Sequence, residues 1–143
     1  MWLARVKEEL GDGLEINWRS FALEQINSKE GDEWKAWEQG ADYTSRGLWA
    51  LRGGIAARAQ GTDAHNDYME KILHIKHVER EDIRTREAVI AVAEAAEIDV
   101  GEFTSVLDDP ATLQQIGIDH ESALERGVFG TPTFVFEDGT SAF

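Results

Sequence analysis

The sequence predicts an α/β fold in which a large block of helices is inserted between two sheet-forming ends. Near the N-terminus, apolar and polar residues alternate over residues 14–22, as in a half-buried strand. Near the C-terminus, residues 133–136 (TFVF) form a β-type run, and Asp138-Gly139 after it indicates a hairpin turn. Between these ends, residues 44–115 carry apolar side chains at helical spacing.

The N-terminal end begins with an amphipathic helix and continues into the strand. Residues 2–10 form this helix, and its apolar face carries Trp2, Leu3, Val6 and Leu10. The glycine-rich turn at residues 11–13 ends it. One face of the strand over residues 14–22 carries Leu14, Ile16, Trp18 and Ser20. The polar residues 28–42 that follow contain a short helix around Trp34 and Trp37.

The helical block is predicted to contain a series of helices. They lie at residues 45–60, 62–77, 82 or 85 to 97, 100–107 and 110–116, with one or two further turns at 119–126. The buried faces of the first two carry Leu48, Trp49, Leu51, Ile55 and Ala56, and Tyr68, Ile72, Leu73, Ile75 and Val78. Glycines 53 and 54 weaken the first helix by roughly 1 kcal/mol each relative to alanine.

Polar residues mark the starts of two of these helices. Thr62 or Asp63 is expected to cap the helix at 62–77. Asp108 and Asp109 are expected to act as a capping pair before Pro110, where a negative charge is favourable at the start of a helix.

Charge and composition limit the classes of partner. The chain has 28 Asp and Glu against 14 Lys and Arg, a net charge of −14. This field repels nucleic acids and anionic membranes, so we expect neither as a partner. The N-terminus is unlike a secretory signal and no apolar stretch is long enough to span a bilayer, which predicts a cytoplasmic protein. The chain has no cysteine, which excludes disulfides and thiolate catalysis within it.

Other clusters of polar side chains predict little chemistry. His74 and His77 lie three residues apart on one predicted helix, but no metal-binding motif accompanies them. Residues 119–121 (Asp-His-Glu) supply carboxylates and an imidazole, and no serine of the chain stands in a nucleophile motif. We therefore expect no metal, no cofactor and no catalytic residue in this chain.

The tryptophans of the helical block have two interpretations. Core packing is the ordinary role of a buried tryptophan. The second interpretation is an apolar cleft between sheet and helices, lined by Trp34, Trp37 and Trp49.

Four stretches of the sequence resemble the DsbA-like branch of the thioredoxin superfamily, in the group that also contains the 2-hydroxychromene-2-carboxylate isomerases. They are WLARVKEELGDGLEINWRSFAL, HIKHVEREDIRTREAVIAVAEAAEID, DHESALERGVFGTPTFVF and EDGTSAF. The resemblance implies a thioredoxin-like fold with a large inserted α-helical domain. Residues 1–27 and 119–143 then belong to the thioredoxin-like domain, and residues 28–118 to the insertion.

The resemblance also implies a substrate-binding loop at Gly130, Thr131 and Pro132. It implies a cis Thr131–Pro132 bond, a geometry that is accessible only before proline. The loop would align an extended peptide or a small thiol ligand beside a catalytic cysteine. From the residues alone, Pro132 is equally well explained as a residue that blocks pairing at the start of an edge strand.

The sequence departs from the family pattern where the reactive group is expected. The Cys-x-x-Cys motif, the central first strand and the C-terminal helix have no counterpart in these 143 residues. We expect a fragment or a gene product begun at an internal methionine; the alternatives are a cysteine-free relative and a partner chain that supplies the strand. Unpaired strand edges predict a poorly stable monomer, or a homodimer formed by strand or helix exchange.

The expected function is that of a DsbA-like thiol–disulfide oxidoreductase family member that is inactive as given, because it lacks redox cysteines. Two alternatives stay open. One is a relative of the glutathione-dependent isomerases. The other is a non-catalytic module that binds a peptide or a thiol ligand.

Overall fold

A computed structural model of the chain describes residues 2–40 and 42–143. Met1 and Ala41 lie outside the described residues, as do the side chains of Trp2 and Leu3, which the sequence places on the apolar face of the first helix. Helices dominate the described chain, and two short strands form its sheet. These features confirm the predicted α/β class with a helical insertion. No described helix has both the length and the apolar character needed to cross a bilayer.

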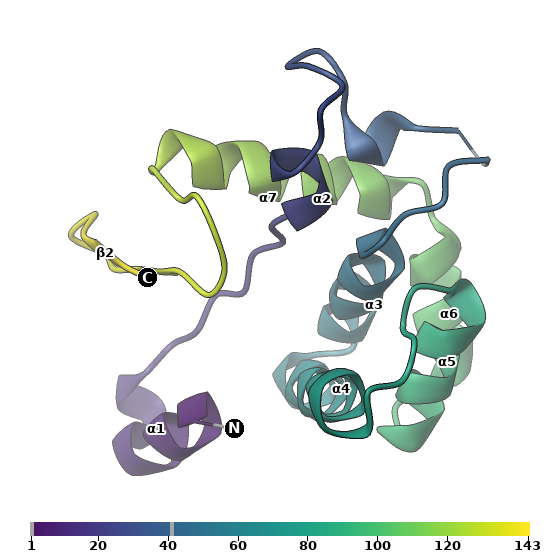
Figure 1. The fold of residues 1–143 in the computed structure, drawn as a ribbon. Coiled ribbons are helices and arrows are strands. Elements are labelled where there is room, and N and C mark those ends of the chain that lie inside the picture. Colours follow the sequence, from purple (N-terminus) through teal and green to yellow (C-terminus); the bar gives the residue numbers. More distant parts are fainter. Residues whose placement is uncertain (1, 41) are drawn as a thin grey trace.

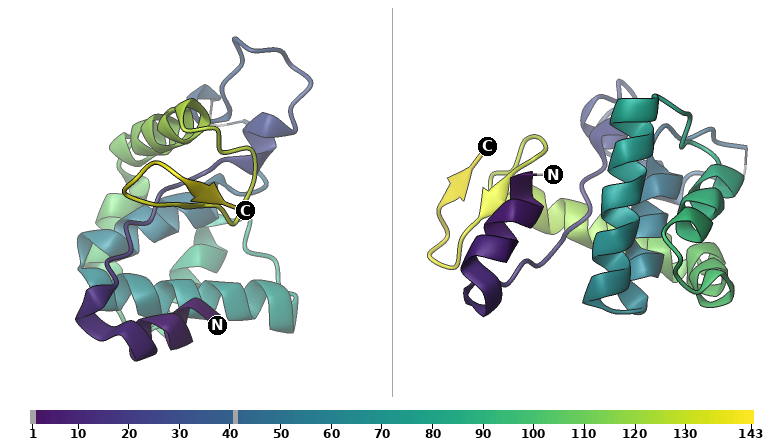
Figure 2. Two further views of the ribbon diagram at one scale, coloured as in Figure 1. Left: turned by 90° about the vertical axis from the view of Figure 1, so that its left-hand side faces the viewer. Right: turned by 90° about the horizontal axis from the view of Figure 1, so that it is seen from below.

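Four helices form the main body of the molecule: α3 (Leu48–Ala59), α4 (Thr62–His74), α5 (Arg86–Ala95) and α6 (Val100–Asp108). Helix α3 packs against each of the other three, and all four lie together in Figures 1 and 2. Alanines on α3 and α5 allow close approach of the helices. The shared core consists of Ala56, Ala57, Tyr68, Ile72, Val89, Val92, Ala93, Phe103 and Leu107.

The predicted buried face of the second helix is correct up to its last turn. Tyr68 and Ile72 are buried, but Val78 is 66% exposed and its predicted inward position is wrong. The reason is that α4 ends at His74, and Ile75–Glu79 forms a wider π-helical turn, η3. A π-turn holds more residues than an α-turn, so it rotates the following side chains away from the apolar stripe.

The start of α4 also differs from the expectation. Neither Thr62 nor Asp63 caps this helix through its side chain, and Gly61 precedes it with a φ of +108°. Glycine reaches this conformation without steric penalty, which permits the tight turn from α3 into α4.

Side-chain caps begin the later helices. Thr85 caps α5 and Asp99 caps α6, each by accepting a backbone N–H three residues on, at 3.1 and 2.8 Å. Asp109 accepts the N–H of Ala111 at 2.9 Å and so supports the start of the last helix. Asp108 does not share this role, because its carboxylate accepts two hydrogen bonds of 2.7 Å from Arg86 instead.

The last helix, α7 (Ala111–Glu125), is continuous, so the prediction of two shorter helices at 110–116 and 119–126 is wrong. Gly117, between those two predictions, lies inside the helix and faces a tryptophan. A Cβ atom at Gly117 would lie 2.5 Å from Trp37 Nε1, so the glycine allows close packing and does not end the helix. The domain boundary expected between residues 118 and 119 falls within this helix.

A second, smaller core connects α7 to the polar segment before α3. The short helix predicted around Trp34 and Trp37 is the 3-10 helix η2 (Ala36–Glu38). The buried members of this core are Ala22, Ala36, Trp37, Leu48 and Ile116, with Trp34 and Tyr43 partly buried beside them.

The N-terminal part runs along one side of the helical body. Helix α1 (Trp2–Leu10) is followed by the 3-10 helix η1 (Gly11–Gly13), an extended segment over residues 14–22 and the short helix α2 (Leu23–Ile26). Burial along residues 14–20 alternates as predicted. No strand pairs with the segment in the described part of the chain, so the predicted strand is an extended segment without a ladder.

The C-terminal part is the predicted hairpin. Strand β1 (Phe134–Val135) pairs antiparallel with β2 (Ser141–Ala142), and Phe134 lies opposite Ala142. Gly139 in the turn has a φ of +83°, which explains the glycine after Asp138. Figure 1 shows α7 across the top of the helical body, with α1 and the hairpin both to one side of it.

We predict opposite effects for alanine at two neighbouring glycines of α3. A Cβ atom at Gly53 would lie 2.0 Å from Tyr68 Oη, whereas at Gly54 its nearest contact is Met69 Sδ at 3.8 Å. Gly53→Ala should lower the free energy of unfolding by about 1–3 kcal/mol through overpacking. Gly54→Ala should raise it by about 0.5–1 kcal/mol through helix propensity. Urea denaturation of both variants measures the difference.

The hydroxyl of Tyr68 supplies the control. It is buried without a hydrogen-bond partner among the described residues, so Tyr68→Phe alone should be neutral or stabilising. Combined with Gly53→Ala, it should recover part of the lost stability. Equal destabilisation by the two alanine substitutions would contradict this account of the packing.

Candidate functional site

The first candidate site is the loop at Gly130, Thr131 and Pro132, between α7 and β1. The Thr131–Pro132 peptide bond is cis. Gly130 is buried, and both Thr131 and Pro132 are exposed. The loop is closed locally, because the Thr133 hydroxyl donates a 2.7 Å hydrogen bond to the carbonyl of Gly130.

The backbone of Thr131 is available for hydrogen bonding. Within the described part of the chain, no hydrogen bond to its N–H or its carbonyl is found. Strand β1 begins only at Phe134, so the bend at Thr131 and Pro132 takes no part in the hairpin ladder. An exposed N–H and C=O next to a strand are the groups that pair with an added peptide strand.

Three exposed phenylalanines lie in the chain segment that contains this loop and the hairpin. Phe129, Phe136 and Phe143 are 68%, 55% and 72% exposed. The rings of Phe129 and Phe143 contact each other with a centroid distance of 5.0 Å. Exposed aromatic side chains gathered in one short segment are typical of a surface that contacts another molecule.

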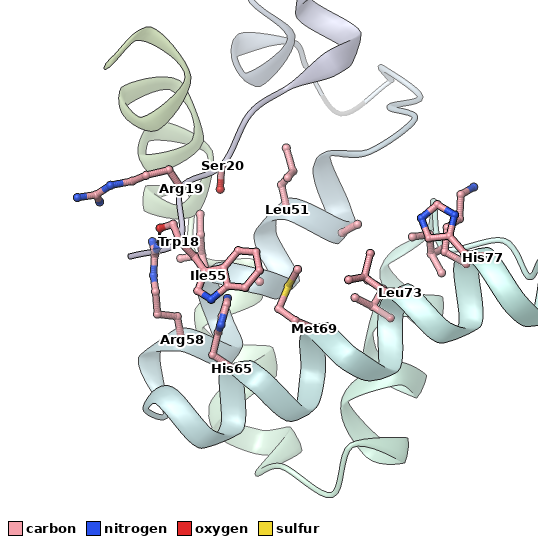
Figure 3. Close-up of a pocket in the computed structure, with 15 residues that line it drawn as sticks. Trp18, Arg19, Ser20, Leu51, Ile55, Arg58, His65, Met69, Leu73 and His77 are labelled. Carbon is pink, nitrogen blue, oxygen red and sulfur yellow. Dashed lines mark hydrogen bonds between the residues drawn. The ribbon is translucent and has the colours of Figure 1, made fainter. Parts of the chain in front are cut away.

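The second candidate site is a cavity of about 230 Å³ against the helical body. Its three walls are a face of α3, a face of α4 and the extended segment at Trp18, Arg19 and Ser20 (Figure 3). The described lining is mainly apolar, with Trp18, Leu51, Ile55, Met69, Ile72, Leu73 and Ile83. Trp34, Trp37 and Trp49, the tryptophans expected to line a cleft, are not among the lining residues.

Helix α7 fixes the extended wall of the cavity. The Asp119 carboxylate accepts the N–H of Ser20 at 3.0 Å, and His120 Nδ1 accepts the N–H of Ala22 at 3.1 Å. From the other side, the Arg58 guanidinium donates to the carbonyl of Trp18. Side chains therefore bind backbone groups of this segment, which has no neighbouring strand among the described residues.

The two acceptors are themselves held in place. Gln115 donates to Asp119 at 2.9 Å, and Arg19 lies 3.6 Å from the same carboxylate. The His120 ring packs against Phe21 and Trp37, with centroid distances of 4.6 and 5.1 Å. Because His120 Nδ1 accepts a hydrogen bond, the neutral ring carries its proton on Nε2, which has no partner among the described residues.

Both buried histidines are kept neutral by their surroundings. Burial, with a smaller contribution from the Arg58 guanidinium, lowers the pKa of His65 to about 4. Burial first, and then the Lys35 ammonium, lower the pKa of His120 below its ordinary value. His65 lies in the cavity wall, with its ring centroid 5.6 Å from that of Trp18.

The remaining clusters noted in the sequence do not form a reactive site. His74 contacts Glu79 at 3.3 Å, and His77 lies at the rim of the cavity. Among the described residues, no three His, Asp or Glu side chains form a group able to hold a metal ion. Asp119 and His120 are buried, and their side chains accept hydrogen bonds from the backbone N–H groups of Ser20 and Ala22.

Sequence reasoning missed the cavity and the role of α7 in forming it. The alternation over residues 14–20 correctly placed Trp18 and Ser20 on an inward face. It carried no information on which element lies opposite, because the contacts to Asp119 and His120 span 99 and 98 residues of sequence.

Comparison with known proteins gives a family and two relatives. Residues 3–143 match the family described as DSBA-like thioredoxin domain. The chain is 31% identical over 147 aligned residues to the uncharacterized protein Rv2286c of Mycobacterium tuberculosis, covering 100% of this chain and 59% of that protein. It is also 29% identical over 86 residues to the ClpXP adapter protein SpxH of Shouchella clausii, covering 60% of this chain and 29% of that protein. The chain thus spans less than two thirds of either relative.

The lowered pKa values of His65 and His120 predict acid-sensitive stability. Histidine in the unfolded chain has a pKa near 6.5, so the unfolded state takes up protons first as the pH falls. The contribution of His65 should be fully present above about pH 6.5 and should be lost as the pH falls toward 4, and the contribution of His120 should be lost in the same direction. Each buried histidine contributes a slope of up to about 1.4 kcal/mol per pH unit.

Urea denaturation between about pH 5 and 6.5 tests this prediction, since most carboxylates stay ionised there. His65→Leu should reduce the slope of unfolding free energy against pH by the contribution of one buried histidine, up to about 1.4 kcal/mol per pH unit. Leu10→Gln, at a side chain that is 57% exposed and does not titrate, serves as the control and should leave the slope unchanged. An identical slope in wild type and His65→Leu would refute the assignment.

Proposed function

The chain belongs to the DSBA-like thioredoxin domain family, and on that premise we propose that its loop at Gly130, Thr131 and Pro132 binds an extended peptide segment. The observation that carries the proposal is the free backbone of Thr131 beside the exposed Pro132. A peptide strand that pairs with this backbone gains hydrogen bonds without displacing any made by the hairpin.

The aromatic side chains around the loop give the peptide its apolar contacts. Phe129 precedes the loop and Phe136 follows it, so alternate side chains of a bound peptide reach one or the other. Residues 127–143 contain Glu137 and Asp138 and no lysine or arginine. The site therefore favours peptides with apolar residues and without negative charge.

The chemistry of disulfide exchange requires a group that this chain does not contain. In that reaction a thiolate attacks one sulfur of a disulfide, forms a mixed disulfide and releases the other sulfur as a thiolate. The 143 residues include no cysteine, so the chain itself binds and does not exchange. We propose that the thiol–disulfide oxidoreductase activity of the complete family fold requires a cysteine placed beside the loop.

A second candidate function is that of a protein-binding adapter. One relative, SpxH, is named a ClpXP adapter protein. The exposed group of Phe129, Phe136 and Phe143 supports this alternative, because it serves a folded partner as well as an extended peptide. A third candidate function is binding of a small thiol ligand such as glutathione at the same loop.

The test is a titration of the ¹⁵N-labelled chain with carboxymethylated insulin B chain, an extended peptide without free thiols. We expect amide shift changes at residues 129–136 and none in α5 and α6. Phe129→Ser should weaken binding about tenfold, as expected for loss of an apolar anchor. Ile118→Ser removes a side chain that is 61% exposed on α7, and binding should be unaffected.

Further arms of the experiment separate the alternatives. Shift changes with glutathione but not with the peptide would replace the peptide by a thiol ligand. No change with either ligand would reject the loop as a ligand site for both. In a reduction assay of insulin with dithiothreitol, the chain should give the same rate as buffer, since it has no thiol.

A further inference from the structure

The cavity between α3, α4 and residues 18–20 has a charge composition opposite to that of the chain. Its described lining contains Arg19, Arg58 and Lys76, together with His65 and His77, and no Asp or Glu; of these cations, Arg19 is already paired with Asp119 behind the wall. The chain as a whole has 28 acidic residues against 14 basic ones. A cavity that gathers cationic side chains and no carboxylates is suited to an anionic ligand.

The apolar part of the lining is mostly aliphatic. Leu51 and Ile55 come from α3, and Met69 and Leu73 from α4. Figure 3 shows Met69 and Leu73 between Trp18 on one side and His77 on the other. Aliphatic side chains with one flexible thioether fit a flexible hydrocarbon chain better than a flat ring system. A cavity of about 230 Å³ exceeds the roughly 150 Å³ that holds benzene and is below the size of drug sites.

Arg58 is the cation best placed to hold a carboxylate in this cavity. Its side chain is partly buried, whereas Lys76 and His77 at the other end are exposed. A charge that is partly buried is less screened, so its pairing with an anion is stronger. The guanidinium uses Nη1 for the Trp18 carbonyl, which leaves further N–H donors in the fixed fork of the side chain.

We infer that this cavity binds a medium-chain aliphatic carboxylate, with its carboxylate on Arg58 and its hydrocarbon chain along Ile55, Met69 and Leu73. His65 lies beside Arg58 as a neutral ring that can donate a further hydrogen bond to the anion. None of the described lining residues belongs to the loop at 130–132, so the inference is independent of the proposed peptide site.

Calorimetry of the 143-residue chain with octanoate, octan-1-ol and octylammonium tests the charge requirement. Octanoate should bind at a single saturable site. Octylammonium should bind at least about tenfold more weakly, since its charge is positive like that of the lining arginines and lysine. Methyl NMR should show shift changes at Ile55, Met69 and Leu73. Equal affinities for the three ligands, or octanoate shifts confined to the Phe129 region, would overturn the inference.

Substitutions at the two ends of the cavity test the orientation. Arg58→Gln should weaken octanoate about tenfold and leave octan-1-ol unchanged, because only the anion loses a charge-assisted pair. Arg58→Lys should give a smaller loss. Arg126→Gln, an exposed arginine at the end of α7 and outside the described lining, is the matched control and should have no effect.

Two more variants keep the test decisive if Arg58→Gln unfolds through loss of the Trp18 contact. Met69→Trp fills the cavity and leaves all charges in place, so it should remove binding of both octanoate and octan-1-ol. Lys76→Gln at the exposed end should change the octanoate affinity less than about twofold. Loss of octanoate binding in Lys76→Gln, or retained binding in Met69→Trp, would refute the assigned position of the ligand.

Discussion

The pairing of an extended backbone with two side chains of α7 is the interaction on which the arrangement of this molecule depends. Asp119 and His120 accept the N–H groups of Ser20 and Ala22, alternate residues of a segment that has no described strand neighbour. Alternate N–H groups on one edge are the donors that a neighbouring strand would receive. Two adjacent helical residues thus take over part of a strand's role. They also hold residues 18–20, one wall of the cavity, in position.

The same interaction carries an energetic cost that the surrounding packing offsets. Keeping His120 Nδ1 as an acceptor leaves its Nε2 proton buried without a partner among the described residues, a loss of about 1–3 kcal/mol for such a group. The ring recovers contact energy between Phe21 and Trp37. Trp37 in turn reaches the ring only because Gly117 leaves room on α7. The contribution of His120 to acid sensitivity and the close approach of Trp37 to Gly117 therefore depend on the same packed group of side chains.

The sequence was most informative where a structural feature depends on neighbouring residues. Alternation over residues 14–20 gave the inward face, and apolar spacing located each main helix to within a few residues. Prediction from the sequence was wrong where a feature depends on residues that are far apart in the sequence. Gly117 packs inside α7 against Trp37, a residue 80 positions away in the sequence. Val78 is exposed because it lies within the π-helical turn η3. Of the two candidate sites, the loop at 130–132 followed from a contiguous motif, whereas the cavity required three separated segments to meet.

The two candidate sites differ in charge, so they favour ligands of different charge. A net charge of −14 repels a small anion at long range, but at physiological salt this field decays within about 8 Å. Inside the cavity the nearest charges are instead cationic, and Arg58 is partly withdrawn from water. Around the loop, residues 127–143 carry two negative charges and no positive ones. An anionic amphiphile is therefore attracted only after it enters the cavity, while a basic or neutral peptide is favoured at the loop. Occupation of one site by its own class of ligand leaves the other site open, because the described residues of the two sites do not overlap.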